Sequence, residues 1–212
     1  MSTDALCWIN GAIIPAHTAK ISVFDHGLLY GDGVFEGIRF YNKRSFRLQE
    51  HLLRLERSAR AIALQLPYSL QQMADFIDAT VNAANFDNGY LRVVITRGAG
   101  SLGIDPRNCA QPDFFVIADT LQMVKAEARE NGARLIIAST RRLPMDGLDP
   151  RVKSLNYLNH ILARIEANQA GMDEAILLNR NGHVAEGTAD NIFIVHNGVL
   201  RTPALSDGAL EG

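Results

Sequence analysis

Apolar and polar residues alternate along much of the first third of the chain, which is the pattern of half-buried β-strands. In the sequence WINGAII, Asn10–Gly11 lies between two apolar runs and predicts a two-residue hairpin turn. In VFEGIRFY, alternation places residues 35, 37, 39 and 41 on one face of a strand and residues 34, 36, 38 and 40 on the other. Gly37 therefore leaves a gap between two large side chains. A small sheet is predicted to begin here.

Two stretches with helical periodicity accompany this sheet. Apolar residues recur at steps of four and three from Leu48 to Leu66, which predicts an amphipathic helix laid on the sheet. A second helix is expected at roughly residues 70–84. The runs GYLRVVITRG and DFFVIAD are rich in β-branched and aromatic residues and predict two further strands. The first half of the chain is therefore predicted to be α+β.

Residues 121–132 are polar and weakly periodic, and we expect a linker there. It would join a small N-terminal α+β domain, residues 1–120, to a second domain, residues 133–212. The second domain is predicted to contain the strand ARLIIAST, a loop rich in Pro and Asp, and a helix after Lys153. Asn–Gly turns at residues 181–182 and 197–198 then predict two hairpins. This half is also expected to be α+β.

Composition and charge narrow the class of protein. The chain has 212 residues, is 47% hydrophobic and 21% charged, and carries a formal net charge of -2. These values favour a globular protein and give no electrostatic footprint for nucleic acid or an anionic membrane. No apolar run approaches membrane-spanning length, and the start MSTDALCWIN has no signal-peptide pattern, so a cytoplasmic protein is expected. Cys7 and Cys109 lack metal-ligand spacing, so neither a metal site nor a disulfide framework is predicted.

Lys153 is the first candidate for chemistry. Apolar residues follow it at helical spacing, which predicts that it lies at or just before the first turn of a helix. The positive end of the helix dipole and any burial disfavour an ammonium at that position, and a neutral amine can attack a carbonyl carbon. Most lysines are solvent-exposed, so the local pattern alone favours an ordinary surface lysine.

Four segments change this balance: YGDGVFEGIR at 30–39, EHLLRLERSA at 50–59, RVKSLNYLN at 151–159 and EGTADNIFIVHNGVLRTPALSDGAL at 186–210. Together they resemble the fold-type IV (class IV) pyridoxal phosphate-dependent aminotransferases over nearly the whole chain. The residues that match the family's signature in register are Glu186, Thr188, Asn191, Ile192, Phe193, Thr202 and Leu210. The resemblance implies a two-domain fold-type IV enzyme whose large cofactor-binding domain begins at about residue 133.

The resemblance also implies a role for individual residues. Lys153 would bind the cofactor covalently and move a proton between the substrate α-carbon and the cofactor, and Glu186 would keep the pyridine nitrogen protonated. Arg54 would bind the cofactor phosphate, for which a guanidinium is well suited. Tyr157 would donate to the phenolic oxygen of the cofactor. The residues expected to pack against its ring are Ala189 and Leu210.

Within the family, the chain is most similar to the branched-chain amino acid aminotransferases. Their substrate pocket is matched by Tyr30, Phe35, Arg39, Tyr90 and Arg92. The loop AGSLGIDPRN is Gly-rich like theirs and lacks the Arg-x-His carboxylate trap of D-amino acid transaminases. The expected reaction is therefore transamination of leucine, isoleucine and valine with 2-oxoglutarate as acceptor. D-amino acid or (R)-amine transamination and aminodeoxychorismate lyase-like activity stay open, and Met123 departs from a Tyr found in some branched-chain enzymes.

The resemblance further implies a homodimer or higher homo-oligomer, since family members assemble their sites near a subunit interface. The family signature continues beyond Gly212, so the sequence is expected to be a C-terminally truncated member with an incomplete second domain. Exposed apolar surface would then favour association. A non-catalytic truncated fragment is the alternative of another class.

Overall fold

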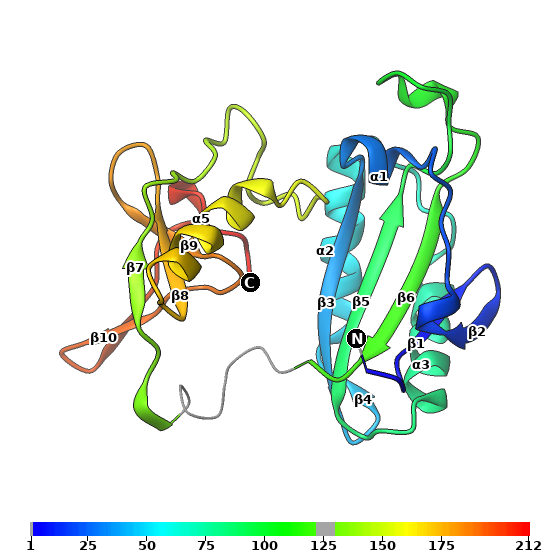
Figure 1. Ribbon diagram of the computed structural model, residues 1–212, viewed down its shortest axis with the longest axis horizontal. Coiled ribbons are helices and arrows are strands. Elements are labelled where there is room, and N and C mark those ends of the chain that lie inside the picture. Colours follow the sequence, from blue (N-terminus) through cyan, green and yellow to red (C-terminus); the bar gives the residue numbers. More distant parts are fainter. Residues whose placement is uncertain (1, 122–129) are drawn as a thin grey trace. The chain divides into compact units, whose positions relative to one another are not determined.

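The computed structural model describes residues 2–121 and 130–212, which divide into two compact units (Figure 1). The first unit contains the chain up to Leu121 together with Lys153–Leu155, and the second contains the rest of the described chain. Most of the predicted linker at residues 121–132, including Met123, lies outside the described residues. No helix within the described ranges is both long and apolar enough to cross a membrane.

The first unit is built on an antiparallel sheet with the strand order β2-β1-β6-β5-β3-β4 (Figure 1). The strands are β1 (Leu6–Ile9), β2 (Ala12–Pro15), β3 (Gly33–Tyr41), β4 (Arg44–Ser45), β5 (Gly89–Thr96) and β6 (Asp113–Asp119). β1 and β2 form the predicted hairpin, in which Asn10 and Gly11 both have positive φ, 51° and 82°. This is the backbone that a two-residue turn of this kind requires.

Side chains alternate between the two faces of β3, and one of these faces is buried in the core. Val34, Ile38 and Phe40 are buried beneath the helices, with Glu36 on the same face. The short strand β4 pairs only with the end of β3, at Phe40 and Tyr41. The edge of β3 near its beginning is therefore open to another partner.

The helices of this unit are α1 (His26–Tyr30), α2 (Leu48–Ala61) and α3 (Leu70–Ala83), and short 3₁₀ turns span Ala16–Thr18 and Pro106–Asn108. α2 and α3 cover the apolar face of the sheet (Figure 1). α3 starts at a capping box between Ser69 and Gln72, in which each side chain bonds the other's backbone.

α2 is shorter than its periodicity predicts. The apolar spacing continues to Leu66, but the helix ends at Ala61, and Ala63 has a positive φ of 50°. The Arg97 guanidinium donates to the carbonyl oxygens of Ile62 and Ala63 at 2.8 and 2.9 Å. It satisfies carbonyls that a helix end leaves without partners. Leu66 still packs on the core, so the apolar spacing persists although the helix does not.

The second unit contains a sheet with the order β7-β8-β9 and a separate hairpin. Its elements are β7 (Leu135–Ile137), α5 (Leu158–Gln169), β8 (Glu174–Leu178), β9 (Val184–Gly187), β10 (Ile194–His196), β11 (Val199–Arg201) and a 3₁₀ turn at Leu205–Asp207. β7 and β8 are parallel, and α5 packs on β8 (Figure 1). The predicted Asn–Gly turns connect β8 to β9 and β10 to β11.

The buried face of α5 is made of small residues. Ala163 and Ala167 are fully buried against Ala175 and Leu177 of β8, whereas the larger Ile161 is 51% exposed. Small side chains let the helix approach the sheet closely. His160 lies on the same buried face, one turn before Ala163.

Candidate active site

Lys153 does not lie at a helix start, and that prediction is wrong. α5 begins at Leu158, and residues 153–155 run antiparallel to the beginning of β3 instead. The N–H of Phe35 donates to the carbonyl oxygen of Lys153 at 3.0 Å, and the N–H of Leu155 donates to that of Gly33 at 2.9 Å. The C=O group of Lys153 and the N–H group of Leu155 therefore find their hydrogen-bond partners on the edge of β3, and not within a helical turn. The helix dipole therefore has no part in the setting of Lys153.

The side chain of Lys153 is half-buried beside the aromatic ring of Phe35. Its Nζ lies 5.0 Å from the centroid of that ring. The backbone N–H of Lys153 donates to Oγ of Ser58 on α2 at 3.1 Å, and Ser58 is itself buried. β3 and α2 thus fix the backbone from which the amine projects.

Arg92 and Tyr90 of β5 belong to the same cluster. The Arg92 Cζ lies 4.4 Å from the centroid of the Phe35 ring and 5.6 Å from that of Tyr90. Gly37, opposite Arg92 in the β3–β5 register, provides the space, since a Cβ there would collide with the Tyr90 hydroxyl. Burial raises the pKa of Tyr90 despite the charge and hydrogen bond of Arg92. The structure therefore brings Phe35, Tyr90 and Arg92 together with Lys153.

Arg39 and Tyr30 have other neighbours. Arg39 pairs with Tyr90 in the strand register, but its guanidinium lies over the Tyr41 ring and donates to the carbonyl oxygen of Leu121 at 2.9 Å. Tyr30, at the end of α1, accepts from the N–H of Gly103 at 2.8 Å. Its hydroxyl thus contacts the Gly-rich loop rather than the Phe35 cluster.

Arg54 forms a buried ion pair that the sequence analysis did not predict. Its Nε and Nη2 donate to the two oxygens of Glu36 at 2.6 and 2.7 Å, and Nδ1 of His51 lies 2.8 Å from Oε2 of the same carboxylate. Glu36 is fully buried. Burial alone would raise the pKa of Glu36, but hydrogen bonds from Arg54 and His51 hold it below its usual value. The sequence did contain a signal for this pair, because Glu36 is a charged residue on the strand face that carries the apolar core residues.

Glu186 occupies a buried polar cluster in the second unit. Its Oε1 lies 2.7 Å from Nε of Arg142 and 3.1 Å from Nε2 of His160, and its Oε2 accepts the N–H of Leu210 at 2.8 Å. Burial would raise the pKa of this carboxyl, but His160, the Leu210 amide and the Arg142 charge together hold it below its usual value. Glu186 is therefore an ionised carboxylate.

The remaining predicted residues of this unit lie near that cluster or on its surface. Tyr157, just before α5, stacks on the His160 ring with centroids 4.5 Å apart. Leu210 reaches Glu186 through its backbone, and Ala189 is exposed. The sequence analysis missed Arg142 and His160. For His160 a signal was present, because it follows Tyr157 by three residues on a helix.

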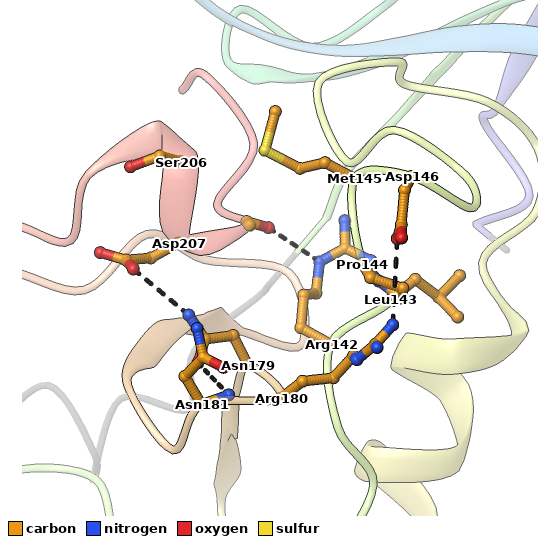
Figure 2. Close-up of a pocket in the computed structure, with 11 residues that line it drawn as sticks. Arg142, Leu143, Pro144, Met145, Asp146, Asn179, Arg180, Asn181, Ser206 and Asp207 are labelled. Atoms are coloured by element: carbon orange, nitrogen blue, oxygen red, sulfur yellow. Dashed lines mark hydrogen bonds and ion pairs between the residues drawn. The ribbon is translucent and has the colours of Figure 1, made fainter.

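Arg142 also lines an open cavity of about 370 Å³ in the second unit (Figure 2). Arg142 donates to the Gly208 carbonyl oxygen at 3.0 Å, and Asn179 donates to Asp207 at 3.2 Å across its wall. None of the predicted site residues lines this cavity. Arg142 both lines the cavity and forms the ion pair with Glu186.

Within the described ranges, the structure contains no group of three or more His, Cys, Asp or Glu side chains that could hold a metal ion.

Comparison with known proteins identifies relatives over nearly the whole chain. The family model described as amino-transferase class IV matches residues 33–212. A putative branched-chain-amino-acid aminotransferase of Methanocaldococcus jannaschii is 51% identical over 97% of this chain and 70% of its own length. The branched-chain-amino-acid aminotransferase of Escherichia coli K12 is 32% identical over 97% of this chain and 68% of its own length.

Solved structures that are similar to this chain are also branched-chain amino acid aminotransferases. An Escherichia coli branched-chain amino acid aminotransferase superposes with a TM-score of 0.93 at 32% identity, covering 98% of this chain and 70% of that one. The branched-chain amino acid aminotransferase of Thermobaculum terrenum in its PLP form has a TM-score of 0.82 at 29% identity, covering 97% of this chain and 69% of that one.

Proposed function

The chain belongs to the class IV aminotransferases, and from this premise we propose that it transfers the amino group of leucine, isoleucine and valine to 2-oxoglutarate. Pyridoxal phosphate is the cofactor of the family, and an aminotransferase of the branched-chain type agrees with the named relatives. The choice of the three amino acids and of the acceptor is the finer part of the proposal. It rests on the residues around Lys153.

The described side chains offer groups that suit pyridoxal phosphate. A primary amine suits the aldehyde carbon, a guanidinium suits the phosphate, and an ionised buried carboxylate suits a protonated pyridine nitrogen. The residues proposed for these roles are Lys153, Arg54 and Glu186, in that order. Tyr157 would donate to the phenolic oxygen, and Ala189 and Leu210 would contact the ring.

Bound pyridoxal phosphate supplies the electron withdrawal that allows a substrate α-proton to leave. In the proposed reaction, the Lys153 amine would take the proton from the substrate α-carbon and would hold it for return to the bound cofactor. This transfer needs an amine whose backbone is fixed, because a misplaced base loses proximity. The bonds to β3 and Ser58 provide that fixation.

The observation that carries the proposal is the arrangement around Phe35. The Lys153 Nζ and the Arg92 guanidinium both lie against its ring, and the buried Tyr90 adjoins Arg92. An aromatic wall suits an apolar side chain, and a guanidinium suits the substrate carboxylate. A branched-chain amino acid combines these two features.

The test uses the purified 212-residue chain with added pyridoxal phosphate. We expect a visible absorption band that Lys153→Ala abolishes and that Lys20→Ala, at an exposed lysine, leaves unchanged. Keto acid formation from leucine, isoleucine and valine with 2-oxoglutarate should exceed that from D-alanine. The opposite order would move the proposal to D-amino acid transamination, and a band that survives Lys153→Ala would refute the role of this lysine.

Homodimerisation is part of the proposal and is supported by apolar surface on the first unit. Leu28 of α1 and Ile104 of the Gly-rich loop are exposed, and their segments are joined by the Tyr30–Gly103 hydrogen bond. Sedimentation should give twice the monomer mass, and a Leu28→Asp variant should shift the distribution to monomer. A reducing compartment such as the cytoplasm agrees with the free thiols of Cys7 and Cys109.

A further inference from the structure

His160 contacts Glu186 through one ring nitrogen, and its other ring nitrogen has no partner among the described residues. Its Nε2 lies 3.1 Å from Oε1 of Glu186. Its Nδ1 is buried and makes no hydrogen bond within the part of the chain that the structure describes. The side chain is 10% exposed, so bulk water reaches it little. Such an arrangement is unusual, since buried polar atoms are normally hydrogen-bonded.

The contact with Glu186 indicates which ring nitrogen donates. Nε2 must carry a proton, because an unprotonated nitrogen would direct its lone pair at a carboxylate. A proton on Nδ1 as well would be buried without an acceptor. The structure therefore places the donated ring proton on Nε2.

Stacking fixes the direction in which His160 donates. The Tyr157 ring lies nearly parallel to the imidazole, at 20° with centroids 4.5 Å apart. Tyr157 precedes His160 by three residues at the start of α5, so the two side chains are neighbours on one face. The ring plane is held, and Nε2 points at Glu186.

The donors around Glu186 leave one acceptor position open. Arg142 and His160 both approach Oε1, and the N–H of Leu210 approaches Oε2. A carboxylate offers about four lone-pair sites, so one site on Oε2 stays available among the described contacts. Two donors hold Oε1 and one holds Oε2, so Oε2 is the oxygen that can accept a further N–H group.

We propose that His160 is a positioning residue that holds Glu186 by Oε1, so that Oε2 accepts the pyridinium N–H of the cofactor. The inference rests on the proposed function, in which Glu186 pairs with that nitrogen. His160 itself does not touch the cofactor in this account. It acts by fixing the orientation of the carboxylate and by adding a donor that keeps it ionised.

The experiment compares variants of the full chain. His160→Leu removes the donor, and His160→Gln keeps an amide donor near the position of Nε2. His183→Leu is the matched control, because His183 faces Asp207 at 3.4 Å and lies outside the Glu186 cluster. Thermal unfolding and circular dichroism establish that each variant is folded. If His160→Leu does not fold, His160→Gln and the unsubstituted chain still give the measurements below.

Two measurements use the protein without cofactor. Nitrogen NMR of ¹⁵N-histidine protein should show a proton on Nε2 of His160 and none on Nδ1. Carbon NMR of the Glu186 carboxyl should show its titration midpoint rising in His160→Leu and staying near the original value in His160→Gln. A proton on Nδ1, or a midpoint that is the same in both variants, would overturn the proposal.

A third measurement uses pyridoxal phosphate and its absorbance. The Kd of the protein for pyridoxal phosphate should rise at least about tenfold in His160→Leu, as expected for the loss of one hydrogen bond to a charged group. In His160→Gln the Kd should stay within about threefold of that of the unsubstituted chain. Borohydride reduction followed by mass spectrometry separates the two levels of inference. No adduct on Lys153 of the unsubstituted chain overturns the proposed function, whereas an adduct with equal Kd values for both variants overturns only the role of His160.

Discussion

Replacing Glu36 by alanine should destabilise the first unit strongly. The Glu36 side chain is fully buried, and the Arg54 side chain that it pairs with is only 12% exposed. The substitution leaves the Arg54 charge in a largely dry setting without its partner. Breaking a buried ion pair in this way costs about 3–5 kcal/mol of unfolding free energy.

The geometry supports a value within that range. The guanidinium and the carboxylate form two parallel hydrogen bonds at 2.6 and 2.7 Å, and His51 adds a third. Unit charges about 4 Å apart attract by about 4 kcal/mol at an effective dielectric constant of about 20. The two estimates agree, so a loss of about 4 kcal/mol is the expected value.

Urea unfolding followed by tryptophan fluorescence is the assay. Trp8 is the single tryptophan of the chain, and it lies in the core of the first unit, so its signal reports that unit. Glu50→Ala is the control, because Glu50 pairs with Arg47 on the exposed surface and should lose nothing measurable. The double variant Glu36→Leu with Arg54→Met should recover much of the loss.

The reasoning would be refuted by a Glu36→Ala midpoint equal to that of the Glu50→Ala control. The pH dependence gives a second check. The pKa of Glu36 lies below its usual value in the folded protein, so its stabilisation is present above the unfolded pKa and is lost as the pH falls through the folded one. A wild-type stability that rises on acidification below about pH 4 would contradict this sign.

Three further predictions follow from single contacts. Gly37→Ala should displace the Tyr90 ring and lower the free energy of unfolding by about 1–3 kcal/mol. NMR of ¹³C-labelled tyrosine should then show the pKa of Tyr90 falling as burial is lost, and an unchanged pKa would contradict the close packing. The Glu166 carboxylate accepts four hydrogen bonds from residues 139–140, which lower its pKa from 4.5 to about 2. Glu166→Gln should therefore destabilise the second unit above pH 4.5, and by circular dichroism the difference should vanish as the pH falls toward 2. Burial raises the pKa of the Cys7 thiol to about 11, so iodoacetamide at about pH 8 should label Cys109 well before Cys7, as mass spectrometry would show; equal rates would contradict the burial of Cys7.

Local pattern predicted the elements of the first unit well. The Asn10–Gly11 hairpin, the alternation in β3 and the helix at residues 70–84 are found where the sequence places them. These features depend on neighbouring residues along the chain, such as a turn that needs positive φ. The family resemblance and the α+β class are confirmed by the comparisons.

Local pattern failed where the deciding partner is distant in sequence. The spacing after Lys153 indicates a helix, but it carries no information about the open edge of β3, which binds residues 153–155. The same holds for α2, whose end is set by Arg97 rather than by its own apolar spacing. Tertiary hydrogen bonds overrode periodicity in both cases.

The candidate site residues came from the resemblance, and the side chains that contact them did not. The motifs nominated Arg54 and Glu186, but they assigned no neighbouring side chain of the protein to either. Glu36 was visible as a charge on an apolar strand face, which predicts a buried pair without naming the second member. Arg142 gave no comparable signal, because surface and buried arginines look alike in sequence.

The pairing of residues 153–155 with β3 has a consequence for the order of folding. Lys153 lies 95 residues after Ser58, its hydrogen-bond partner, so the contact closes a long loop. During synthesis the N-terminal part of the first unit, up to Leu121, emerges before Lys153, and domains generally fold first from the N-terminal side. Until then the beginning of β3 is an uncovered strand edge, which is a template for pairing with other chains. The segment that carries Lys153, the proposed cofactor lysine, thus also covers this strand edge once it is made.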